Sequence, residues 1–114
     1  YQPHTYSRIA YLWDEWLRCW HGLDGLVVLE TYAARERPAA GRSAADLAAA
    51  IDHPKAEYAA TFEEAARIVA RTVQPGDVVF TIGAGDVDAV AADVAGMRHP
   101  LPTDHKLVFG VVAE

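Results

Sequence analysis

The sequence predicts an α/β domain in which a mostly parallel sheet is flanked by helices. Two apolar runs of the kind found in buried parallel strands, Leu26–Leu29 and Asp77–Ile82, are separated by segments with helical patterns. Strands that alternate with helices indicate βαβ units with right-handed crossovers. At 114 residues, with 52% hydrophobic and 23% charged residues, the chain is large enough for one domain with a core of its own.

The opening residues, Tyr1–Arg8, indicate the end of a strand, a tight turn and the start of a helix. Pro3 fixes its own φ and pushes Gln2 toward extended geometry. Ser7 is then expected to cap a helix that begins near Arg8. The residues that follow carry an apolar stripe at helical spacing: Ile9, Leu12, Trp13, Trp16, Leu17 and Trp20. Packing of one helix on a sheet explains these three tryptophans better than a binding platform does.

Two helices in the middle of the chain are predicted to begin at capping boxes. The first box, Ser43–Asp46, opens an alanine-rich helix that runs to Ile51, and the second is Thr61–Glu64. A short strand, Tyr58–Ala60, lies between these helices. A last helix follows the second apolar strand and has one apolar face: Val87, Val90, Ala91 and Val94. This order of elements is typical of a Rossmann-like domain with three layers.

The two ends of the chain suggest that one strand of this sheet is not among the 114 residues. Tyr1 has the character of the last residue of a strand, so we expect residues 1–114 to be a piece of a longer protein, without the core strand that leads into Gln2. A final strand is predicted at Lys106–Val112, after a loop at Arg98–Asp104. We hypothesise that Leu107–Val112 pairs in the vacant position of the sheet, in its own domain or in a neighbour.

The first candidate site is the opening corner, because ligands of α/β sheets bind at the carboxyl ends of strands. The guanidinium of Arg8 is unfavourable at a helix start and suits bidentate recognition of a carboxylate or phosphate. Pairing with a nearby acidic side chain explains it equally well. His4 either contacts an anionic ligand or bonds the backbone of its own turn.

The second candidate site is the corner Gly83–Val87. Gly83 and Gly85 permit close approach of a ligand to the backbone, and a helix start favours an anion. Asp86 can cap that helix itself, so a plain tight turn is at least as good an explanation. Neither of the common glycine-rich phosphate-binding motifs is present in the sequence.

Composition excludes several classes of function. A net charge of −6 and a pI near 5.2 argue against nucleic acid or an acidic membrane as the main partner. No apolar run approaches the roughly 20 residues that span a bilayer, and we expect no signal peptide. The single cysteine, Cys19, fits a reducing compartment, and we expect a packed thiol rather than a nucleophile. The other histidines lack metal-ligand spacing, so no metal site is expected: His21, His53, His99 and His105.

Three blocks in order resemble the C-terminal domain of the Mur ligases. The first is Tyr1-Gln2-Pro3-His4-Thr5-Tyr6-Ser7-Arg8, which matches the family pattern aromatic-Gln-Pro-His-x-Tyr/Phe-Ser/Thr-Arg-Thr. The second is Glu30–Glu36, and the third is Pro75–Val79 running into Gly83–Val87. The resemblance covers about Tyr1 to Val94 and is closest to the members that join L-alanine to UDP-N-acetylmuramate.

The resemblance implies a cytoplasmic ATP-dependent ligase of peptidoglycan precursor synthesis, of which residues 1–114 are the amino-acid-binding domain. In that family the muramate carboxylate is phosphorylated, and the amino-acid amine displaces phosphate. Carried over, the alanine carboxylate would lie at Arg8 with His4 beside it, and the remaining substrate-binding residues would be Tyr6, Ser7, Gly83, Ala84 and Gly85. ATP and Mg²⁺ would bind to the central domain of the longer enzyme, so the isolated domain is expected to be inactive, with no catalytic residue, metal or cofactor of its own.

This chain departs from the family pattern at three positions near the first corner. Ile9 replaces the usual threonine, Ala10 replaces a common basic residue, and Thr5 fills a position that is arginine in some members. Two alternatives therefore stay open. One is a sister ligase with a different amino-acid or peptide substrate, and the other is a non-catalytic α/β module that binds a small ligand.

Overall fold

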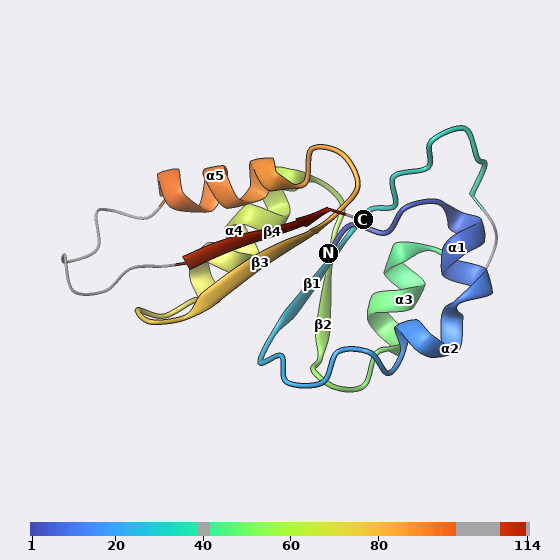
Figure 1. Ribbon diagram of the computed structural model, residues 1–114, viewed down its shortest axis with the longest axis horizontal. Helices are drawn as coiled ribbons and strands as arrows, with labels where there is room; N and C mark the ends of the chain where they lie inside the picture. The colour runs from blue at the N-terminus through green and yellow to red at the C-terminus, as the bar shows by residue number, and fades with distance from the viewer. Residues whose placement is uncertain (39–41, 98–107, 114) are drawn as a thin grey trace.

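A computed structural model describes residues 1–38, 42–97 and 108–113 of the chain (Figure 1). The predicted α/β fold is confirmed. The elements run in the order α1 (Tyr6–Tyr11), α2 (Trp13–Trp16), β1 (Leu26–Leu29), α3 (Ala44–Ala50), β2 (Ala56–Ala59), α4 (Phe62–Thr72), β3 (Val78–Gly83), α5 (Asp88–Met97) and β4 (Val108–Ala113). The predicted loop at 98–104 lies outside the described residues.

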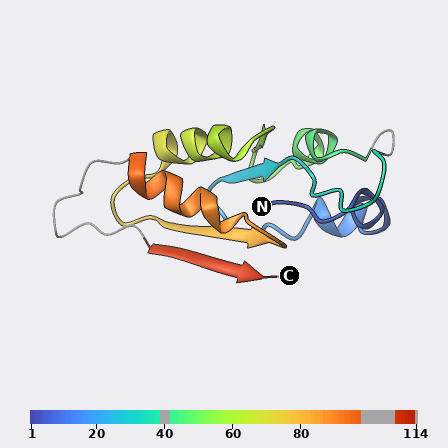
Figure 2. The ribbon, with the colours of Figure 1, turned by 90° about the horizontal axis from the view of Figure 1, so that it is seen from above.

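The opening segment, Tyr1–His4, joins two parallel pairs of strands. β1 pairs with β2, and β3 pairs with β4, both in parallel. Gln2 N–H donates to the carbonyl of Ile82 at 2.9 Å, and Leu29 N–H donates to the carbonyl of Tyr1 at 2.8 Å. The sheet order is therefore β2, β1, the opening segment, β3 and β4, which Figure 2 shows from above.

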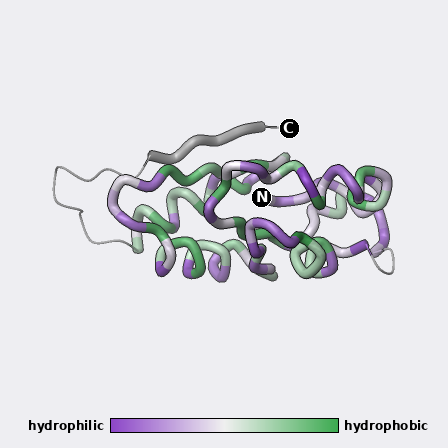
Figure 3. The backbone as a smooth tube through the Cα atoms, turned by 90° about the horizontal axis from the view of Figure 1, so that it is seen from below, coloured by the Kyte–Doolittle hydropathy of each residue, from purple (hydrophilic) through white to green (hydrophobic). Residues whose placement is uncertain are grey.

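Two apolar clusters hold the helices against this sheet. Val28 belongs to a cluster with α3 and the tryptophan segment, which we call the α3 cluster, whereas Leu29 belongs to a cluster with α4 and α5, which we call the α4–α5 cluster. Successive strand residues point to opposite faces, so the clusters lie on opposite sides of the sheet. The helices show alternating hydrophobic and hydrophilic residues, as expected where only one face is buried (Figure 3).

The capping boxes were predicted with good accuracy. Ser43 Oγ accepts a hydrogen bond from Asp46 N–H, and the Asp46 carboxylate accepts one from Ser43 N–H, so the first box is complete. At the second box, Thr61 Oγ1 accepts from Glu64 N–H, but the Glu64 carboxylate accepts from Ala60 N–H. Each helix begins where its local chemistry predicts.

The single tryptophan-bearing helix was predicted wrongly. The chain instead forms two short helices, α1 and α2, that meet at Leu12, and Trp20 lies beyond both. The ring of Tyr1 packs against Trp16 and Trp20 at centroid distances of 5.1 and 5.2 Å. The prediction that the tryptophans pack against the sheet is nevertheless confirmed, since Trp20 is buried and Trp13 and Trp16 pack on the α3 cluster.

The hypothesis that the tail fills the vacant position of the sheet is wrong for its own domain, and pairing in a neighbour stays a prediction. β4 pairs with β3 along its whole length, and Ala113 lies opposite Gly83. Gln2 also lies opposite Gly83. A strand residue has one neighbour on each edge, so β4 occupies the edge of β3 that faces away from β1 (Figure 2). Among the described residues, only the opening segment lies between β1 and β3.

Candidate functional site

The opening corner is built on a short pairing between Tyr1–His4 and the segment after β1. Tyr32 N–H donates to the carbonyl of Pro3, and Thr5 N–H donates to the carbonyl of Tyr32, both at 2.9 Å. The rings of His4 and Tyr32 stack, with centroids 5.5 Å apart and an angle of 13° between their planes. Thr5 then has a φ of 68°, a strained value for a residue other than glycine, and turns the chain into α1.

The start of α1 is capped by Glu36 and not by Ser7, which corrects the sequence prediction. The helix begins at Tyr6, so Ser7 lies within its first turn, and Thr5 makes no capping bond. Ser7 N–H donates to Glu36 Oε2 at 2.9 Å, and Ser7 Oγ donates to Glu36 Oε1. The carboxylate thus takes up backbone donors that α1 cannot satisfy internally.

Glu36 was not predicted as a site residue. Its hydrogen bonds from the Ser7 side chain and backbone hold the pKa of Glu36 below its usual range, with smaller contributions from the Tyr6 backbone and the charge of His4. Glu36 therefore connects the 33–38 loop to α1 through hydrogen bonds and to His4 through charge. The signal in the sequence was the place of Glu36 at the end of the second Mur-like block.

We predict that Glu36→Ala loosens α1 without unfolding the domain. The amide hydrogens of Ser7 and its neighbours should exchange faster with solvent, since they lose their acceptor. Exchange in Glu36→Gln should be faster than in the parent chain and slower than in Glu36→Ala, because glutamine keeps an acceptor oxygen and loses the charge. In the parent chain the protection should persist at acidic pH and fade only below the usual range of a glutamate, because protonation of a carboxyl with a lowered pKa removes its preference for the folded state. Exchange measured by NMR tests this, with Glu15→Ala on the exposed face of α2 as the control.

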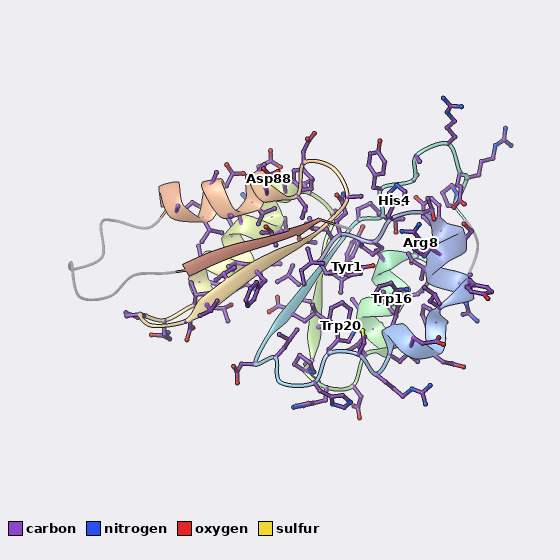
Figure 4. The ribbon with its side chains drawn as sticks, viewed as in Figure 1. Tyr1, His4, Arg8, Trp16, Trp20 and Asp88 are labelled. Atoms are coloured by element: carbon purple, nitrogen blue, oxygen red, sulfur yellow. The ribbon has the colours of Figure 1, made fainter. Side chains whose placement is uncertain are left out.

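The other residues predicted at this corner differ in exposure. Arg8 is exposed on α1, and Figure 4 shows Arg8 and His4 at the same end of the molecule. Ser7 is also exposed and is engaged by Glu36. Tyr6 is buried, so it supports the corner from below and does not line its surface. A negatively charged ligand that approaches Arg8 would therefore meet His4 and the Glu36 carboxylate as neighbours.

The second corner lies directly beside the first. Gln2 pairs with Gly83, and this contact brings the ends of the opening segment and β3 together at one edge of the sheet. Gly83 is buried, Ala84 is half-buried, and Gly85 is exposed with a φ of 95°. Gly85 therefore needs the conformational freedom of glycine, whereas Gly83 is needed for close approach.

We predict that Gly83→Ala destabilises the domain by about 1–3 kcal/mol, the usual range for an overpacked core. An added Cβ would lie 3.0 Å from the carbonyl oxygen of Gln2 and 3.2 Å from Cγ1 of Val87. Neither neighbour has room to move, because Gln2 is held in the sheet and Val87 is buried. Gly96→Ala on α5 is the matched control, since its Cβ meets nothing within 4 Å and should be neutral or slightly stabilising. Denaturant unfolding of both variants measures the difference, and equal midpoints would contradict the prediction.

A carboxylate and a phenol form a further pair at the ends of β1 and β2. Tyr58 OH donates to Glu30 Oε2 at 2.5 Å, which raises the pKa of Tyr58 to about 12. The other oxygen of Glu30 accepts from Thr31 N–H at 2.8 Å, and Gln2 Nε2 donates to the Glu30 carbonyl at 3.2 Å. Sequence reasoning did not select this pair, because Glu30 and Tyr58 meet only through the pairing of β1 with β2.

Comparison with known proteins identifies relatives of the chain, although no family model matches it. The UDP-N-acetylmuramate–L-alanine ligase of Mycolicibacterium vanbaalenii is 43% identical over 94 residues, which are 82% of this chain and 20% of that protein. The ligase of the same name from Rhodococcus jostii is 38% identical over 105 residues, which are 92% of this chain and 21% of that protein. The chain is a Mur ligase homologue. It spans about a fifth of the length of the curated relatives it matches.

In the part of the chain that the structure describes, the remaining candidate residues form no second functional site in this Mur ligase homologue. Cys19 was expected to be packed within a helix, but it lies beyond α2 and is exposed. Partial desolvation raises the pKa of its thiol, which disfavours a reactive thiolate. His21 and His53 are exposed, and His99 and His105 lie outside the described residues. Within 1–38, 42–97 and 108–113, no cluster of three or more histidine, cysteine or acidic side chains could hold a metal ion, and no helix has the length and apolar character to cross a membrane.

Proposed function

We propose that residues 1–114 are the C-terminal, amino-acid-binding domain of an ATP-dependent UDP-N-acetylmuramate–L-alanine ligase of peptidoglycan synthesis. The observation that carries the proposal is the meeting of two corners at one sheet edge. One corner offers Arg8 and His4, and the other offers the backbone of Gly83–Gly85. The names of the relatives supply the substrate class.

In this proposal the domain binds and orients L-alanine, and it catalyses no reaction alone. The guanidinium of Arg8 would take the carboxylate of L-alanine, with His4 as a neighbouring donor. The amine of alanine would then face the acyl phosphate of UDP-N-acetylmuramate, and its attack would form the amide and release phosphate. ATP and Mg²⁺ would be held by a central domain of the same longer cytoplasmic enzyme, over which this domain closes.

A chimeric enzyme tests the proposal. Residues 1–97 would replace the matching segment of the Mycolicibacterium vanbaalenii ligase, and phosphate release from ATP would be measured with UDP-N-acetylmuramate and a panel of amino acids. We expect release that depends on L-alanine, with glycine, L-serine and D-alanine weaker. A folded chimera that prefers another amino acid would favour a sister ligase. A folded chimera that forms acyl phosphate but responds to no amino acid would favour a module that binds a different ligand.

A further inference from the structure

One short segment, residues 32–36, contacts the opening corner at both of its ends, and we call it the 32–36 turn. At its start, Tyr32 pairs with His4 in a parallel bridge, and the rings of these two residues stack. At its end, the Glu36 carboxylate accepts hydrogen bonds from the backbone and the hydroxyl of Ser7. The turn therefore links His4 to the residue directly before Arg8, and Figure 4 shows His4 and Arg8 at the same end of the molecule.

The backbone of this corner is held in strained conformations. Within the described residues, the non-glycine residues with a positive φ are Thr5, at 68°, and Ala34, at 54°. Thr5 lies between His4 and Arg8 in the chain, and Ala34 lies inside the 32–36 turn, which a backbone hydrogen bond of 2.9 Å closes. Such conformations persist only where their surroundings over-determine them, and they cluster at ligand sites. The strain therefore points to a corner whose geometry serves a ligand and not only the core.

The ring of Tyr32 is placed to orient the imidazole of His4. The exposed fraction of Tyr32 is 49%, so about half of its surface gains nothing from burial, and core packing does not explain its position. The two rings lie nearly parallel, at 13°, with their centroids 5.5 Å apart. A parallel aromatic neighbour limits rotation of the imidazole, so the ring nitrogens of His4 are kept in one plane.

Glu36 is better explained as a support for α1 than as a contact for the ligand. Both of its carboxylate oxygens already accept hydrogen bonds from Ser7. A carboxylate also repels the kind of anion that Arg8 and His4 are suited to bind. The helix that Glu36 caps has only six residues, a length at which a helix is marginal by itself. Loss of this cap would therefore leave Arg8 on a turn that is helical for only part of the time.

We propose that the 32–36 turn positions His4 and Arg8 so that both engage one carboxylate, that of the incoming amino acid. Tyr32 holds the plane of the imidazole, and Glu36 holds the helical turn that carries the guanidinium. Neither side chain touches the amino acid, so both are positioning residues. The inference rests on the proposed function for the nature of the ligand, whereas the coupling between the two ends of the turn does not depend on that function.

The chimeric ligase tests the role of the turn in binding. Tyr32→Ala should raise the KM for L-alanine roughly 3- to 10-fold, the value of a lost aromatic pair. Glu36→Ala should raise this KM roughly 3- to 30-fold, the value of a lost helix cap, because apparent affinity falls with the fraction of molecules that is competent to bind. The kcat and the KM for ATP should change by less than about twofold, since the turn acts on binding of the amino acid.

Two variants serve as matched controls in the same chimera. Tyr32→Phe keeps the stacked ring and should behave as the parent does. Glu15→Ala removes an exposed carboxylate from α2 and should also leave the KM for L-alanine unchanged. If Tyr32→Phe raises the KM as much as Tyr32→Ala does, the phenol itself contacts the amino acid, and the positioning role of Tyr32 is wrong.

The kinetic results separate this inference from the proposed function. An unsubstituted chimera that responds to no amino acid would overturn the proposed function, and with it the role of the turn in amino-acid binding. A chimera that responds to L-alanine but keeps the same KM in Tyr32→Ala and Glu36→Ala would overturn the inference alone. A thermal unfolding scan of each variant checks that the domain remains folded.

Nuclear magnetic resonance of the 114-residue chain tests the turn without any substrate. In Glu36→Ala, the nuclear Overhauser contacts between the rings of His4 and Tyr32 should lose intensity, because the turn has lost one of its two anchors. In Glu15→Ala these contacts should keep the intensity of the parent chain. Contacts that are unchanged in Glu36→Ala would mean that the two ends of the turn act separately, and the proposal that one element positions both groups would be wrong.

Discussion

The 114-residue chain with an unmodified Tyr1 amine should become more stable as the pH rises from 6 to 8. In the unfolded chain this amine has a pKa of 8.0, whereas burial in the folded chain lowers the pKa to about 6. Between these values the unfolded state binds the extra proton, so raising the pH favours the folded state. The gain should reach about 2–3 kcal/mol, since each unit of pKa difference is worth about 1.4 kcal/mol.

Urea unfolding at pH 5.5, 6.5, 7.5 and 8.5 measures this dependence. Below pH 6 the amine is protonated in both states, and above pH 8 it is neutral in both, so the free energy of unfolding should level off on either side with respect to this group. Acetylation of the amine is the matched control, because it keeps the hydrogen bond to Val27 and removes the titration. If the acetylated chain shows the same rise, a group other than the Tyr1 amine is responsible and the prediction is wrong.

In the chimeric ligase, Arg8→Ala should raise the KM for L-alanine by about 30- to 150-fold, or about 2–3 kcal/mol, the value of a lost charge-assisted hydrogen bond. This prediction rests on the proposed function. Arg8→Lys should recover only part of the loss, because an ammonium keeps the charge without the planar fork. The kcat should change less than KM if Arg8 holds the carboxylate equally in the ground state and the transition state.

Arg67→Ala is the matched control for Arg8, since Arg67 is an exposed arginine on α4. A KM for L-alanine that is unchanged in Arg8→Ala would remove Arg8 from the amino-acid site. Glu36→Ala in the same chimera separates the two elements of the corner. It keeps the Arg8 side chain itself and removes the contact that fixes the start of α1.

Local signals in the sequence were enough for most of the secondary structure. Ser43 and Asp46 satisfy each other's backbone within four residues, so α3 needs no distant partner to begin where it does. Leu26–Leu29 is apolar at every position, as a strand covered on both faces must be, and the structure buries it between two clusters. The resemblance of the opening block to Mur ligases was likewise local, and relatives at about 40% identity confirm it.

Contacts between distant residues decided the features that were missed. The tryptophan stripe has the period of one helix, but Tyr1 packs on Trp16 and Trp20 and the chain forms two short helices that break at Leu12. Glu36 lies 29 residues from Ser7, and no local pattern links a loop carboxylate to a distant helix start. The same explanation applies to Glu30 and Tyr58, because only the register of β1 with β2 brings these two residues together.

By itself the sequence determined most of the strands and helices, and which protein family the chain resembles. Those properties depend on the spacing of apolar residues and on caps that act over one turn. The tertiary structure alone decided the order of strands in the sheet and the edge that β4 occupies. Several strand orders satisfy the same apolar pattern, and the free energy that selects one of them comes from backbone pairing and side-chain packing between residues far apart in the chain.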